Sequence, residues 1–191
     1  MTMPRPISLG ALTLLLIGTT ACGNTKAAEE AIARADRFYT GMQEEAAKVM
    51  PEAVKRLADT LQKAKDHLAA GDGTAAQAAA VEAAGEAVRL AKLVPRKRVE
   101  LDSIYKAVSR EVTYPVQQTV AKVRQLNNAG RIPPGVTRAA FDSVKTVIAA
   151  WEGDWKAATE DYQKGQLAAA ANKANAVKSS VIAAMRMLGV K

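Results

Sequence analysis

The side chains that most often perform chemistry in proteins are scarce in this chain of 191 residues, which contains one histidine, His67, and one cysteine, Cys22. A catalytic triad needs a histidine beside a nucleophile and an orienting acid, and zinc sites built from histidine and cysteine need several such ligands. Di-iron bundles require Glu-x-x-His pairs, and c-type haem attachment requires Cys-x-x-Cys-His. None of these sets occurs in the sequence. We therefore expect no enzyme activity, no metal site and no cofactor.

His67 leaves one redox alternative open. It lies four residues before Gly71, in the predicted last turn of a helix, where the helix dipole stabilises a protonated imidazole. The simpler interpretation is a solvated residue at a helix end. The alternative is that His67 and Met42 or Met50 are axial ligands of a non-covalently bound haem. Methionines at the spacing of a helix seam are usually core residues, so we favour the first interpretation.

Cys22 directly follows an apolar run over residues 7–21, and Arg5 precedes that run. A basic start, an apolar stretch of this length and small residues at its end are typical of a secretory signal peptide. The run is shorter than the roughly 20 apolar residues that a membrane-spanning helix needs. We therefore predict a signal peptide over residues 1–21.

The surroundings of Cys22 resemble the lipidation site of bacterial membrane lipoproteins. The resemblance rests on the small pair Thr20-Ala21 before the cysteine and Gly23 after it. It implies a diacylglycerol on Cys22, often with a third acyl chain such as palmitate, followed by a short tether up to residue 27. It also implies a location in the cell envelope, anchored on the extracytoplasmic side of a membrane. Gly23 favours the outer membrane if the cell has two.

An alternative maturation step is ordinary cleavage after Ala21, because Thr19-Thr20-Ala21 is an acceptable small-x-small cleavage site. The product would be a soluble periplasmic or secreted protein with a free thiol near its start. No intrachain disulfide can form in either case, because the chain has a single cysteine.

The charge of the chain favours anionic partners. The formal net charge is +8, and +7 from Cys22 onward, since Arg5 is the only ionisable side chain before it. Lipid head groups, acidic envelope polymers and acidic proteins fit this charge, whereas no aromatic-interleaved basic motif indicates nucleic acid. Arg96, Lys97 and Arg98 cluster at a predicted helix start, where the dipole disfavours cations. Because three cations at this position make the predicted helix slightly less stable, we expect the cluster to have a binding role.

The apolar positions recur in alternating steps of three and four, which predicts packed helices. We expect an all-α fold, with residues 28–191 forming a single domain. Its architecture should be an antiparallel bundle of about four to six helices, kinked near Pro51 and Pro115. A further helix boundary is expected at Pro95, with the next helix beginning near Arg96.

Two features of the alanine-rich segments bear on this fold. Over residues 74–93 alanine is so frequent that the inward face is weakly defined, and we assign it to Val81, Ala84, Val88 and Ala91. The hairpins around Gly71 and Gly165 look alike and lie 94 residues apart. They indicate either a duplicated helical unit or a likeness of composition alone, and we favour the likeness of composition.

Trp151, Trp155 and Tyr162 form an aromatic stripe on one predicted helix. Large rings opposite an alanine-lined helix are what close packing in a core would produce, and this is the preferred interpretation. The alternative is a slot between the helices that accepts an apolar ligand or a partner helix.

The sequence thus predicts a non-enzymatic cell-envelope lipoprotein, a helical binding or scaffold module. Its partner would be a protein or an anionic envelope component that docks on Arg96, Lys97 and Arg98. The alternative is an extracytoplasmic protein that binds a small apolar molecule in a slot near Trp151 and Trp155.

Overall fold

The computed structural model describes residues 20–130, 132 and 134–189, so the predicted signal peptide up to residue 19 lies outside the described part. The described residues form helices and no strand, which confirms the all-α prediction. Over the same residues, no helix combines the length and the apolar character needed to cross a membrane. The helices are α1 (Thr20–Val49), α2 (Pro51–Ala69), α3 (Gly73–Asn128), α4 (Arg138–Gln163) and α5 (Leu167–Met187).

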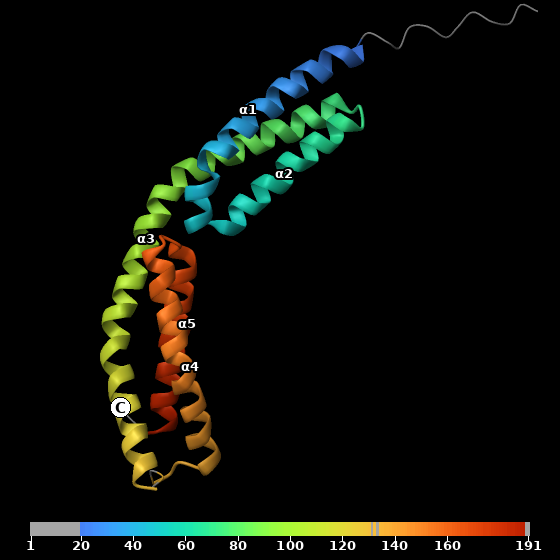
Figure 1. The fold of residues 1–191 in the computed structure, drawn as a ribbon. Helices are drawn as coiled ribbons and strands as arrows, with labels where there is room; N and C mark the ends of the chain where they lie inside the picture. Colours follow the sequence, from blue (N-terminus) through green and yellow to red (C-terminus); the bar gives the residue numbers. More distant parts are fainter. Residues whose placement is uncertain (1–19, 131, 133, 190–191) are drawn as a thin grey trace, which may run out of the picture.

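The five helices form two three-helix bundles that share α3 (Figure 1). The N-terminal bundle contains α1, α2 and the first half of α3, and the C-terminal bundle contains the second half of α3 with α4 and α5. The 56 residues of α3 correspond to about 84 Å of helix. The molecule is therefore a curved rod, with the start of α1 at one end and the connection between α3 and α4 at the other.

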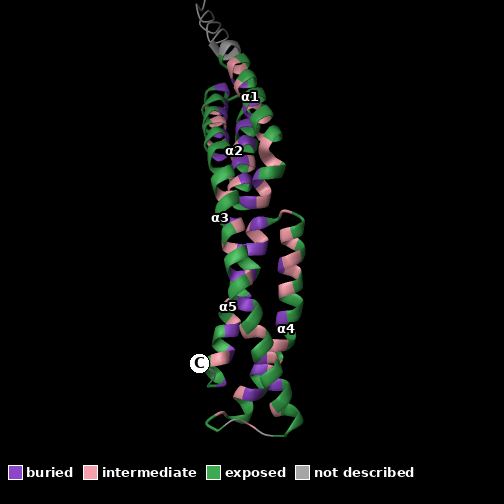
Figure 2. Cartoon of the chain, turned by 90° about the vertical axis from the view of Figure 1, so that its left-hand side faces the viewer, coloured by how far each residue is buried: buried purple, intermediate pink, exposed green. Residues whose placement is uncertain are grey.

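Each bundle has its own core, and the buried residues run along the inside of both bundles (Figure 2). The N-terminal core contains Ala28, Ile32, Ala35, Leu57, Leu61, Ala64, Ala76, Ala80, Ala83, Ala87 and Leu90. The C-terminal core contains Tyr105, Val108, Val112, Val123, Phe141, Val144, Trp151, Ala158, Ala170, Ala174, Val177, Val181, Ala184 and Leu188. A small third cluster from α1, α3 and α5 joins the bundles, through Val49, Leu101, Leu167 and Ala171.

The predicted interruption at Pro51 is confirmed, and it is a complete reversal of chain direction (Figure 1). α1 ends at Val49 and α2 begins at Pro51, with only Met50 between them. Proline suits the first position of a helix, because its missing N–H would have no partner there.

The predicted helix boundary at Pro95 is wrong, because α3 continues through both Pro95 and Pro115. A proline inside a helix displaces the carbonyl four residues earlier, which for Pro95 belongs to Ala91. Ala91 and Pro95 are both exposed, so water can bind the Ala91 carbonyl, which lowers the energetic cost of placing Pro95 inside the helix. α3 bends as it passes from one bundle to the other (Figure 1). At the second proline, the backbone carbonyl of Pro115 itself accepts a hydrogen bond from the hydroxyl of the buried Thr119 at 2.8 Å.

The inward face assigned to the first half of α3 is also wrong. Val81 and Val88 are 61% and 43% exposed, Ala91 is exposed, and Ala84 is only partly buried. Close packing of α1 and α2 against α3 explains the difference, since a methyl side chain fits where a larger one would not. The buried residues here are Ala76, Ala80, Ala83, Ala87 and Leu90.

The two hairpins are alike in geometry as well as in composition. Gly71 and Gly165 both adopt a positive φ, +81° and +74°, which is the usual conformation just after a helix end. The backbone hydrogen bonds around Gly71 recur 94 residues later around Gly165. Buried alanines recur at the same offset, with Ala64, Ala76 and Ala80 matched by Ala158, Ala170 and Ala174. The two bundles therefore repeat one three-helix arrangement.

The first turns of α1 pack against the turn between α2 and α3. The Asn24 side-chain amide donates to the Thr74 hydroxyl at 3.1 Å. A Cβ atom at Gly73 would lie 2.9 Å from the backbone carbonyl carbon of Asn24, so only glycine permits this approach. Residues 24–27, which were expected to form a tether, are thus part of α1. The side chain of Cys22 lies outside the described part of the structure.

Candidate functional site

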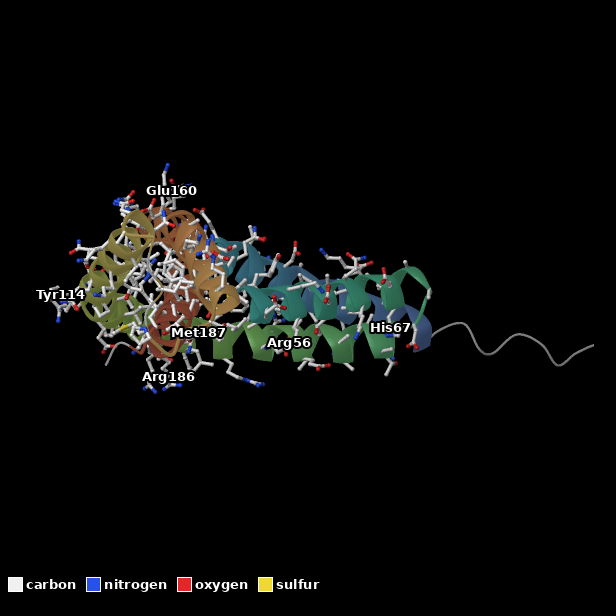
Figure 3. The ribbon with its side chains drawn as sticks, turned by 90° about the horizontal axis from the view of Figure 1, so that it is seen from below. Arg56, His67, Tyr114, Glu160, Arg186 and Met187 are labelled. Carbon is white, nitrogen blue, oxygen red and sulfur yellow. The ribbon has the colours of Figure 1, made fainter. Side chains whose placement is uncertain are left out.

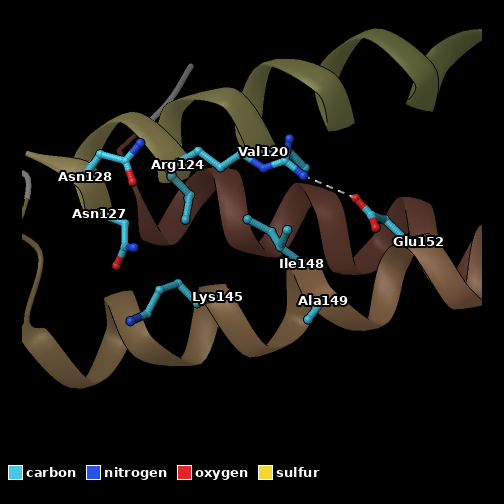
Figure 4. A pocket seen from close by; sticks show the side chains of 9 residues that line it. Val120, Arg124, Asn127, Asn128, Lys145, Ile148, Ala149 and Glu152 are labelled. Atoms are coloured by element: carbon cyan, nitrogen blue, oxygen red, sulfur yellow. Dashed lines mark ion pairs between the residues drawn. The ribbon is translucent and has the colours of Figure 1, made fainter.

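A groove separates α3 from α4 near the end of the rod. Here the backbones of the two helices lie apart, and α5, which packs against both, runs behind the space between them (Figure 4). The groove has a volume of about 440 Å³. Its lining residues are Val120, Val123, Arg124, Asn127, Asn128, Lys145, Ile148, Ala149 and Glu152.

The connections between helices differ in the two bundles, and the longer one lies beside the groove. In the N-terminal bundle the equivalent pair, α1 and α2, packs together and is joined by the single residue Met50. In the C-terminal bundle nine residues, 129–137, join α3 to α4. The longer connection allows these two helices to lie apart, so part of their apolar seam remains uncovered.

The middle of the groove is apolar and its edges are polar. Val120 and Val123 of α3 face Ile148 and Ala149 of α4. At one edge an ion pair crosses the groove, with 3.7 Å between the Arg124 guanidinium and the Glu152 carboxylate (Figure 4).

At the tip of the rod the groove continues into a second hollow of about 80 Å³, which shares Asn127 and Lys145 with it. The ammonium of Lys145 lies 2.8 Å from the Asp142 carboxylate and 5.5 Å from the centre of the Phe141 ring. Arg138 also pairs with Asp142, at 3.6 Å. The hydrogen bond from Lys145 lowers the pKa of Asp142, which therefore stays ionised at neutral pH.

Neither tryptophan of the predicted slot lines either hollow. Trp151 is 2% exposed in the C-terminal core, and its indole N–H has no hydrogen-bond partner within the described residues. Trp155 is partly buried and stacks on Tyr105, with 6.0 Å between the ring centres. Tyr105 also stacks on Tyr162 at 4.1 Å. Tyr105 thus fills the space beside Trp155, and the groove lies nearer the start of α4, between Lys145 and Glu152.

A polar contact links α3 to α4 beside this aromatic stack. The Tyr162 hydroxyl donates to the Asp102 carboxylate at 2.6 Å, and the Lys106 ammonium donates to the same carboxylate at 2.8 Å. The bonds from Lys106 and Tyr162 lower the pKa of Asp102. The bond to Asp102 raises the pKa of Tyr162, because it favours the neutral hydroxyl.

The basic cluster lies on α3 where the two bundles meet. Arg98 pairs with Glu45 of α1, and Lys97 pairs with Glu100 at 2.6 Å. Arg96 is exposed and has no ion-pair partner within the described residues. Consecutive residues of a helix point about 100° apart, so the three cations are distributed around α3, and Glu45 and Glu100 already neutralise two of them.

His67 is exposed near the end of α2, beside the start of α1 and far from the C-terminal bundle (Figure 3). Met50 lies at the opposite end of α2, about 25 Å away along the helix axis, so His67 and Met50 cannot bind one haem together. Within the described residues, no three histidine, cysteine or acidic side chains are grouped so that they could hold a metal ion.

Comparisons of the chain with models of protein families, with characterised proteins and with solved structures found no match. Among the features described, sequence reasoning missed the groove. Val120, Val123 and Ile148 fall on the steps of three and four that predict packed helices, and nothing in that spacing distinguishes them from core positions. The nine residues between Asn128 and Arg138 are the one signal of a wider separation between α3 and α4.

Proposed function

We propose that this protein is a non-enzymatic lipoprotein of the bacterial cell envelope, a rigid helical rod that is anchored at one end and binds an anionic partner along its length. One observation carries the proposal: the residues just after Cys22 pack at the very end of the rod, beside Gly73. α3 then runs about 84 Å to Asn128 at the other end. An anchor on Cys22 would therefore hold the C-terminal bundle away from the membrane.

The chemistry of the anchor follows from the resemblance around Cys22. One acyl chain binds a membrane only marginally, whereas two or three hold a protein stably. Because α1 is helical from its start, little slack chain separates the lipid from the N-terminal bundle. The anchor would therefore keep the N-terminal bundle close to the membrane.

The partner would dock on the basic surface at the junction of the bundles. Arg96 and Lys92 are exposed there and have no ion-pair partner within the described residues. Arg96 lies 23 residues after Gly73, or about 35 Å along α3 from the anchored end. This distance favours an acidic protein or polymer over the head groups of the anchoring membrane.

A charge-reversal experiment tests the binding role. Lys92→Glu with Arg96→Glu should weaken binding of polyglutamate, a simple acidic polymer, at least tenfold at low salt, because ion pairing at this surface would be lost. The matched control is Lys55→Glu with Lys156→Glu, which changes the net charge equally at exposed sites elsewhere. Equal loss in both variants would show that only net charge matters and would contradict a docking surface at Arg96.

A further inference from the structure

We propose that the groove between α3 and α4 binds a slender amphipathic anion, a single aliphatic chain that ends in a carboxylate or a phosphate. This ligand site goes beyond the anchored rod, and its existence does not depend on the anchor or on the basic surface around Arg96. Four observations carry it: the contrast between the two bundles, the dimensions of the groove, its apolar middle and its charged end.

The contrast between the bundles shows that the groove is a built feature of this fold. The same three-helix arrangement occurs twice, with matched turns at Gly71 and Gly165. In the N-terminal copy the first two helices pack together along their length. In the C-terminal copy the stack of Tyr105, Trp155 and Tyr162 joins the corresponding pair at one end, and the groove lies at the other end, near the connecting residues 129–137.

The dimensions of the groove suit a single chain. On α4 the lining runs from Lys145 to Glu152, which is about 10 Å along the helix axis. The groove volume of about 440 Å³ leaves room along that length for an aliphatic chain.

The apolar middle supplies the surface that such a chain needs. Val120 lines one wall and Ile148 and Ala149 line the other, while Val123, which also borders the groove, is 5% exposed and belongs to the C-terminal core. Each methylene group removed from water contributes about 0.8 kcal/mol, which corresponds to roughly fourfold in affinity. A chain long enough to follow these walls should therefore bind more tightly than a shorter homologue.

The charged end supplies the counter-charge for the head group. At the end of the groove near Lys145, the two cations of Arg138 and Lys145 pair with the single carboxylate of Asp142, which leaves one net positive charge. The Arg124 guanidinium lies at the other end, where Glu152 neutralises it (Figure 4). The Lys145 ammonium has three donors, so it can bind a ligand oxygen while it keeps its bond to Asp142. The Asn127 side chain extends from α3 toward Lys145 across the groove (Figure 4).

Calorimetric titration with sodium dodecanoate, below its micelle concentration, tests the proposal. The protein is produced from residue 22 as the Cys22→Ser variant, which keeps nearly all of α1 and the other four helices and has no acyl chain of its own. Saturable binding of one dodecanoate per chain is expected. Butanoate, which is too short to follow the groove, should bind at least tenfold more weakly because it buries fewer methylene groups, and dodecyltrimethylammonium at least tenfold more weakly because its charge is opposite.

Two matched variants locate the binding site. Ala149 and Ala150 are adjacent exposed residues of α4, and only Ala149 lines the groove. Ala149→Phe should fill the groove and weaken dodecanoate binding at least tenfold, while Ala150→Phe should bind like the parent. Lys145→Glu should weaken dodecanoate binding and strengthen binding of dodecyltrimethylammonium, a reversal that misfolding would not produce.

Three results would overturn the proposal. The first is the absence of saturable dodecanoate binding, and the second is equal binding by the Ala149→Phe and Ala150→Phe variants. The third is a protein dimer, measured by sedimentation, that Ala149→Phe alone dissociates, since a second copy would then occupy the groove. None of these results bears on the anchor at Cys22 or on the surface around Arg96.

Discussion

Asp102 accepts hydrogen bonds from Tyr162 of α4 and Lys106 of α3, so this contact between the two helices depends on the ionisation of its side chains. Its neighbours lower the pKa of Asp102, so its contribution to stability is complete above about pH 4 and is lost as the pH falls through that lowered pKa. Tyr162 has the opposite behaviour. Its pKa is raised, so its contribution is complete below about pH 10 and is lost as the pH rises through the raised pKa.

Replacing Tyr162 by phenylalanine should therefore lower the free energy of unfolding at pH 7 by about 1 kcal/mol, the net value of one hydrogen bond. The difference from the parent protein should shrink above pH 10, because the parent loses the same bond there. Denaturant titrations at pH 7 and pH 11 measure both effects. Tyr114→Phe is the control, since Tyr114 is 65% exposed and points away from the molecule (Figure 3). An equal loss in both variants would contradict a role for the Tyr162–Asp102 bond.

Among the elements, α3 determines the shape of the molecule, because it belongs to both bundles. In its first half, between α1 and α2, it buries a row of alanines, and in its second half it buries larger side chains such as Tyr105 and Val112. The change from small to large side chains along one helix means that its neighbours pack closely at one end and at a greater distance at the other.

This packing makes an opposite prediction for two nearby residues of α3. Ala83→Leu should destabilise the N-terminal bundle by about 1–3 kcal/mol, because Ala83 is fully buried and a larger side chain would overpack the site. Val81→Ala should be neutral or stabilising by up to about 0.5 kcal/mol, because Val81 is 61% exposed and alanine favours helix. Thermal unfolding followed by circular dichroism compares the two. A larger loss for Val81→Ala would mean that the inward face was assigned correctly from the sequence after all.

The sequence predicts the elements well where large aliphatic or aromatic side chains mark one face. In α5 the apolar residues from Leu167 to Leu188 recur in steps of three and four and are buried, and the predicted interruption lies at Pro51. The first half of α3 could not be assigned in this way, because alanine occupies its inner and outer faces alike, and the larger Val81 and Val88 lie outside. The groove could not be predicted either, because it depends on how far apart α3 and α4 lie.

At the scale of the whole molecule, the predicted anchor, the basic surface and the groove lie at three different positions along the rod. The residues after Cys22 pack at one end, the cations around Arg96 lie at the junction of the bundles, and the groove lies near the other end. Val49, Leu101 and Leu167 belong to the small core that joins the bundles, so the two halves are connected by packing as well as by α3. A rod of this kind can hold a docking surface and a ligand site at fixed distances from a membrane.

The anchor is the claim on which this arrangement depends, and the intact mass of the protein in its own host tests it most directly. We predict that the protein is recovered with the membrane fraction and has the mass of residues 22–191 plus a diacylglycerol group, with or without a third acyl chain. The acyl mass should be absent from a Cys22→Ala variant. Recovery of the unaltered protein in the soluble fraction, with the bare mass of residues 22–191, would contradict the proposal of a lipid-anchored rod.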